Sequence, residues 1–128
     1  MSTTTEVERV VRTVHIGEEQ YVVLVPSVKV TFSGDIAEVA GYLHVAVVSR
    51  GDTAVHYYVV GVEEWSVGVS EEEIKRKVEQ VLKKANEKAE EYAKALSTVL
   101  SLGARISFRG NLASRDELPE WLRKHLPP

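Results

Sequence analysis

The hydrophobic pattern of the chain changes once, from runs typical of strands to the spacing of a long helix. Runs rich in Val, Tyr, Phe and Thr, broken by turn residues, predict strands over 6–16, 21–32, 42–49 and 53–67. Valines in the first run also fit helical spacing, so a helix stays open there. Pro26 indicates an edge position or a bulge, because proline cannot donate to a ladder. Residues 33–41 are predicted to be a connection with at most one helical turn.

A long amphipathic helix is predicted over 71–102. Ser70 and Glu73 form a capping box, and Gly103 is a natural stop. Apolar residues repeat along one face: Ile74, Val78, Val81, Leu82, Ala85, Ala89, Tyr92, Ala93, Leu96, Val99 and Leu100. Such a helix spans roughly 48 Å, whereas a ten-residue strand spans about 33 Å. We therefore expect the helix to extend beyond its sheet and to pair with a second copy of the chain. The small residues Ala85 and Ala89 would permit close approach of the two helices. The alternative is a helix that bends around its own sheet.

The remaining residues predict a short strand over 104–110 and a short helix over 114–126. A chain of 128 residues suits one domain. It divides into a polar tail (1–5), a β-rich part (6–69), the long helix (70–102) and a strand plus short helix (103–128). We predict an α+β fold in which an antiparallel four- to five-stranded sheet packs on one long amphipathic helix, with a short C-terminal helix.

The two faces of the predicted sheet differ in character. With Arg50 opposite Thr53, cross-strand partners share a face. One face is almost pure hydrocarbon and should pack on the long helix: Leu43, Val45, Val47, Tyr58, Val60 and Val62. The other mixes aromatic and basic residues with valines: Tyr42, His44, Ala46, Val48, Arg50, Val55, Tyr57, Val59 and Trp65. Alternation adds Ser27, Lys29, Arg105 and Arg109 to this second face. One register of the first strand adds Arg12, Val10, Val14 and Ile16.

Composition narrows the setting of the protein. The net charge is −3, so any nucleic-acid site must be a local basic patch. Cysteine is absent, the initiator is the only Met, and Asn occurs only at Asn86 and Asn111, which favours a thermophile. No signal sequence and no apolar run of about 20 residues is present, so we expect a cytoplasmic protein without membrane contact.

Motifs for catalysis are missing. The four histidines form no HxH or HExxH pattern, no phosphate-binding glycine loop occurs, and adjacent Glu63 and Glu64 point to opposite faces of a strand. The Arg-Gly-Asp at 50–52 reads as a hairpin turn. We therefore expect no metal, no cofactor and no enzymatic activity.

The second face suggests a function. Cations meet phosphates and aromatic rings stack on unpaired bases at roughly 1–3 kcal/mol each, as single-stranded nucleic acid requires. Two other functions stay open. The second face could be covered by another subunit or by the terminal helix, or the sheet could enclose an apolar ligand beneath Leu43, Val60 and Phe32. Trp121, Arg123 and Lys124 in the terminal helix could extend a nucleic-acid groove.

The predicted architecture over about residues 6–110 resembles the ThermoDBP and ThermoDBP-related single-stranded DNA-binding proteins of hyperthermophilic archaea. The resemblance rests on architecture, on the aromatic and basic face and on composition, not on a motif. It implies an oligomeric protein without an OB-fold that binds single-stranded DNA, with no strong sequence preference, in a cleft between sheet and helices. By residue character, the implied contacts are Lys29, Tyr42, Arg50, Tyr57, Trp65, Arg105 and Arg109.

Overall fold

The strands of the protein lie side by side in chain order. The computed structural model describes residues 9–128. Its antiparallel sheet contains β1 (Arg12–Gly17), β2 (Gln20–Ser33), β3 (Ile36–Ser49), β4 (Ala54–Gly68) and β5 (Leu112–Ser114). The long helix α1 (Glu71–Ser101) follows β4, and the 3₁₀ turn η1 (Arg115–Glu117) and the short helix α2 (Glu120–Arg123) follow β5. The predicted α+β fold is therefore confirmed.

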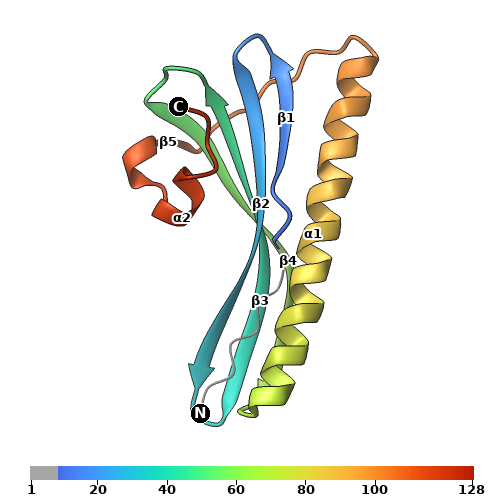
Figure 1. Ribbon diagram of the computed structural model, residues 1–128, viewed down its shortest axis with the longest axis vertical. Helices are drawn as coiled ribbons and strands as arrows, with labels where there is room; N and C mark the ends of the chain where they lie inside the picture. The colour runs from blue at the N-terminus through green and yellow to red at the C-terminus, as the bar shows by residue number, and fades with distance from the viewer. Residues whose placement is uncertain (1–8) are drawn as a thin grey trace.

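Helix α1 lies along one face of the sheet over its whole length (Figure 1). The Ser70 hydroxyl accepts a hydrogen bond from the Glu73 N–H, as the capping box predicts. The predicted overhang of the helix beyond its sheet is wrong. Strands β2 and β3 have 14 residues each rather than ten. They therefore span about 46 Å, which is also the length of a 31-residue helix. Ala85 and Ala89 are fully buried against the molecule's own sheet. These alanines are not available to a second copy.

A β-bulge in β4 changes which side chains face α1. The predicted register holds from Val47 opposite His56 to Tyr42 opposite Gly61. The pairing then shifts by one residue, so that Val39 lies opposite Trp65. An extra residue in one strand inverts its alternation beyond that point. Trp65 therefore faces α1, where the Lys77 ammonium lies 4.0 Å from its ring centroid, and its predicted place on the second face is wrong.

Two other segments differ from the sequence-based prediction. Residues 36–41 belong to β3 and pair on both sides, so the connection is only Gly34 and Asp35. Residues 104–109 form no strand. Ile106 and Phe108 nevertheless pack against the core beneath α1. Their alternation arises from this packing and not from a ladder.

The strand predicted over 6–16 is confirmed over 12–16, within β1 (Arg12–Gly17). Residues 9–11 are not part of the strand, and residues 6–8 lie outside the described part. Arg12 and Val14 pair with Leu24 and Val22, which face α1. The outward positions predicted for Arg12, Val14 and Ile16 are therefore wrong. Val14 and Ile16 pack against the core beneath α1, and the Arg12 guanidinium lies 3.9 Å from Glu90 of α1. Pro26 lies beyond the last described pair of β1 with β2, so on that side it takes an edge position, as the sequence predicts.

Within residues 9–128, the second face, the sheet face opposite α1, is covered near one end. There η1 and α2 dock through Leu118 and Leu122, which bury the β-sheet valines Val23, Val25, Val48 and Val55. In Figure 1, α2 and the C-terminus lie on the opposite side of the sheet from α1. The predicted helix over 114–126 is shortened because Pro119 separates the 3₁₀ turn from α2. Cover by the terminal helix was one of the alternatives that the sequence left open for the second face, and the terminal segment does cover part of it.

Candidate functional site

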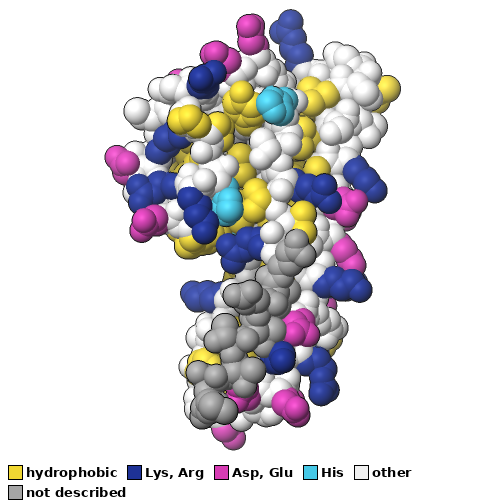
Figure 2. Space-filling view, in the orientation of Figure 1, with side chains coloured by type: hydrophobic (Ala, Val, Ile, Leu, Met, Phe, Trp, Pro, Cys, Tyr) yellow, Lys and Arg dark blue, Asp and Glu magenta, His cyan; other side chains and the backbone are white. Residues whose placement is uncertain are grey.

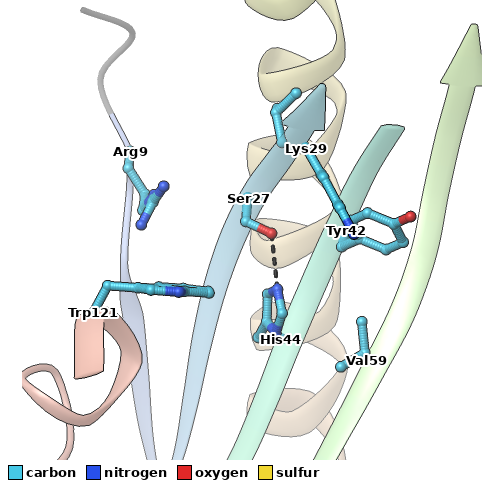
Figure 3. Close-up of a pocket in the computed structure, with 8 residues that line it drawn as sticks. Arg9, Ser27, Lys29, Tyr42, His44, Val59 and Trp121 are labelled. Atoms are coloured by element: carbon cyan, nitrogen blue, oxygen red, sulfur yellow. Dashed lines mark hydrogen bonds between the residues drawn. The ribbon is translucent and has the colours of Figure 1, made fainter. Parts of the chain in front are cut away.

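A pocket of about 450 Å³ lies on the second face beside α2. We call it the Trp121 pocket. Its lining comes from β2, β3, β4, α2 and the residues before β1: Arg9, Ser27, Val28, Lys29, Tyr42, His44, Val59 and Trp121. Figure 3 shows Arg9 and Trp121 on one side of Ser27 and His44, and Lys29 and Tyr42 on the other. Its volume lies in the range of small-ligand sites.

The aromatic wall of the pocket is built on α2. Trp121 is held beside His44, with ring centroids 4.9 Å apart in an edge-to-face arrangement. The Arg9 guanidinium lies over the Trp121 ring, 5.2 Å from its centroid, which is a cation–π geometry. Leu122, the next residue, is fully buried. Burial of Leu122 thus fixes the position of Trp121 at the pocket.

A row of three hydrogen-bonded side chains forms the polar base of the pocket. Ser27 Oγ lies 2.8 Å from His44 Nε2, and His44 Nδ1 lies 2.6 Å from the Tyr57 hydroxyl. The Tyr57 ring is nearly parallel to the imidazole. The register explains the row, since Ser27 pairs with Tyr42 and His44 with Val59 on neighbouring strands of one face. Because each member has a partner, the cost of burying these polar groups is reduced.

The electrostatics of the pocket favour an anion. Arg9 and Lys29 line it, and no carboxylate does among the described residues. Burial, and secondarily the charge of Arg9, lowers the pKa of His44 from 6.5 to about 4, so the imidazole is neutral at pH 7. Burial also raises the pKa of Tyr57 above 10.0. Figure 2 shows Lys and Arg side chains around apolar and His side chains at mid-height of this view.

The structure brings together three of the seven predicted site residues. Lys29 and Tyr42 line the pocket, and Tyr57 contacts it through His44. Arg50 lies in the turn at the end of the β3–β4 hairpin, where its N–H donates to the Glu19 carbonyl. Arg105 lines a separate groove against α1, and the Arg109 carbonyl accepts a hydrogen bond from Tyr58, which packs on the α1 side. The second-face positions predicted for Arg105 and Arg109 are wrong, because no strand carries them there.

Three polar pocket residues, Arg9, Ser27 and His44, lay outside the predicted set, although alternation had placed Ser27 and His44 on the correct face. Ser27 and His44 are the buried polar side chains of the described core, and they interrupt runs of valine in the sequence. Polar residues at such positions are the signal that could have found them. Arg9 had no such signal, because only the fold brings it over Trp121. Trp121 itself was predicted as a possible extension of the groove.

Comparison with known proteins adds no relationship. No protein-family model, curated protein or solved structure matches the chain. The resemblance to the ThermoDBP proteins therefore stays a prediction. No helix in residues 9–128 is long and apolar enough to cross a membrane, and the same residues contain no cluster of three or more His, Asp or Glu side chains that could hold a metal ion.

Proposed function

We propose that the protein binds single-stranded nucleic acid, most simply single-stranded DNA, at the Trp121 pocket and along the adjoining second face. One observation supports this most: the pocket joins the rings of Tyr42 and Trp121 to a guanidinium and an ammonium, without a carboxylate. Phosphates would meet Arg9 and Lys29, and a base would stack on an aromatic ring or on the guanidinium plane. The proposal assigns the protein no catalysis and no cofactor.

The surface beside the pocket suits a chain rather than a single small molecule. Val59 is 50% exposed next to the pocket, and a Cβ built on Gly61, two residues further along β4, meets no atom within 4 Å. A strand of nucleotides could therefore continue from the pocket past Val59 and Gly61. A subunit interface on the second face would have less apolar surface to bury, because α2 already covers the apolar end of this face.

The two tryptophans provide an internal test of this proposal. Trp121 lines the pocket, and Trp65 lies on the α1 side beneath Lys77. An unstructured oligonucleotide should therefore quench the fluorescence of the Trp65→Phe variant, which retains Trp121. It should leave the Trp121→Phe variant, which retains Trp65, nearly unchanged. Duplex DNA serves as the control ligand.

Salt dependence and a pair of charge variants complete the test. Removal of one phosphate contact, by Lys29→Ala, should reduce the slope of log K against log salt by about 0.7. Arg105→Ala is the matched control, since Arg105 lines the groove on the α1 side. If a fluorescent oligonucleotide does not bind at micromolar protein concentration and low salt, the proposed function is refuted.

The proposal includes self-association of the chain, but through the C-terminal end of α1 and not, as the sequence predicted, through the middle of the helix. Mid-helix alanines are buried, but Val99 and Leu102 at the end of α1 are 38% and 79% exposed. Val99 also lines the apolar groove with Tyr92, Leu96 and Ile106. We propose that copies of the chain meet through this end of α1.

A further inference from the structure

Within the polar row beneath the Trp121 pocket, Ser27 is the hydroxyl-bearing residue that lines the pocket, and it is 8% exposed. His44 Nδ1 is turned towards Tyr57. Figure 3 shows the Ser27 hydroxyl directed at the imidazole between the Trp121 and Tyr42 sides. Both ring nitrogens of His44 are already engaged, by Ser27 and by Tyr57, so Ser27 is the candidate in this row for a hydrogen bond to a ligand.

The protons of the row decide what Ser27 can offer. At neutral pH Tyr57 carries its hydroxyl proton, as an ordinary tyrosine does, and burial raises its pKa further. His44 carries a single ring proton because its pKa is lowered to about 4. If Tyr57 donates to Nδ1, the ring proton is on Nε2 and is donated to Ser27 Oγ. The Ser27 O–H is then free to donate, and a lone pair remains to accept. In the other tautomer the Ser27 O–H donates its hydrogen bond to His44 Nε2, so towards a ligand Ser27 can act only as an acceptor.

We propose that Tyr57, through His44, keeps the Ser27 hydroxyl both a donor and an acceptor, and that this hydroxyl contacts the bound base. Thymine and guanine carry a keto acceptor where cytosine and adenine carry an amino donor. A hydroxyl that can do both accepts either kind of base. This inference rests on the proposed function and supplies a physical reason for weak sequence preference at the site.

Homopolymers of thymidine and of deoxycytidine test the inference in the full-length protein. The wild type should bind both with similar affinity. Ser27→Ala should weaken both by about three- to tenfold and to the same degree within about twofold, since one hydrogen bond is lost in each case. Ser27→Ala removes only a hydroxyl, so circular dichroism should show the wild-type fold.

Tyr57→Phe tests the relay itself. Without the phenol, nothing holds the ring proton of His44 on Nε2. In part of the molecules the Ser27 O–H then donates its hydrogen bond to Nε2 and is not free to donate to a base. Binding of the thymidine homopolymer should then fall several-fold more than binding of the deoxycytidine homopolymer. Tyr58→Phe is the matched control, because the Tyr58 hydroxyl bonds to the Arg109 carbonyl on the α1 side, and it should leave the ratio unchanged.

The outcomes separate the two proposals. If the wild type binds both homopolymers but Ser27→Ala binds as tightly as the wild type, Ser27 makes no contact and the inference is wrong. An unchanged ratio in Tyr57→Phe overturns it as well, and in both cases nucleic-acid binding stands. If the wild type binds neither homopolymer, the proposed function falls and takes the inference with it.

Discussion

His44 shows how one residue can link the stability of the protein to its candidate site. It is a histidine in the middle of β3, buried among valines and held by Ser27 and Tyr57. Desolvation disfavours the charged imidazole, and the neighbouring Arg9 adds to this effect. A neutral imidazole keeps the pocket from repelling Arg9, so the cation can remain over Trp121 at physiological pH.

The lowered pKa of His44 predicts an acid-sensitive fold. Between pH 6.5 and about 4 the unfolded chain binds a proton that the folded chain does not. His44 thus contributes stability that is present above pH 6.5 and lost as pH falls towards 4, of order 2 kcal/mol after allowance for partial solvent screening. Urea unfolding at several pH values should show this loss in the wild type and a smaller one in His44→Gln. His15→Gln, at an exposed histidine, should behave as wild type. Parallel pH profiles of His44→Gln and wild type would contradict the assignment.

The contact between β3 and α1 depends on a glycine. A Cβ built at Gly41 would lie 2.5 Å from Val81 Cγ1, and Val81 is fully buried. A β-branched side chain has few rotamers into which it can move. The helix approaches the sheet closely here because the strand has no side chain at this position. Gly41 also lies beside the bulge that turns Trp65 towards α1.

Gly41→Ala should therefore destabilise the fold, although alanine favours a strand more than glycine does. We expect the free energy of unfolding to fall by about 1–3 kcal/mol, as for other overpacked cores. Gly61→Ala is the matched control, because no atom lies within 4 Å of a Cβ there, and it should be neutral or slightly stabilising. In a double-mutant cycle measured by urea unfolding, Val81→Ala should recover part of the loss. Additive effects of the two substitutions would exclude the clash.

At the scale of the whole molecule, the two faces of one sheet are used differently. Helix α1 matches β2 to β4 in length and runs along one face, whereas α2 has four residues and, within residues 9–128, covers one end of the other face (Figure 1). The partial cover creates the Trp121 pocket at its border. Exposed apolar side chains remain at the end of α1, at Val99 and Leu102.

Self-association through this end of α1 predicts a molecular mass in solution of at least two chains. Val99→Lys should shift the mass measured by light scattering towards that of one chain, because a charge would be buried in the interface. Leu112→Lys is the matched control, since Leu112 is also exposed but lies on β5. A wild-type mass of one chain at every concentration tested would refute self-association.

The sequence by itself determined the architecture and most of the faces of the sheet. Periodicity and caps are local signals, so the long helix from Ser70 and the pairing of β3 with β4 could be predicted up to Gly61. The alternation of β2 correctly placed Ser27 and Lys29 on the second face. These features depend on residues close in the chain or on a single turn.

Only the tertiary structure decided the rest. A bulge of one residue inverts the alternation of β4 and moves Trp65 to the other face, and no local pattern announces it. Residues 104–109 alternate like a strand, yet they pack under α1 without a ladder. Arg9 and Trp121 meet although 112 positions separate them in the chain. The Trp121 pocket exists because α2, β2, β3 and the residues before β1 converge, and such convergence is set by packing between distant segments.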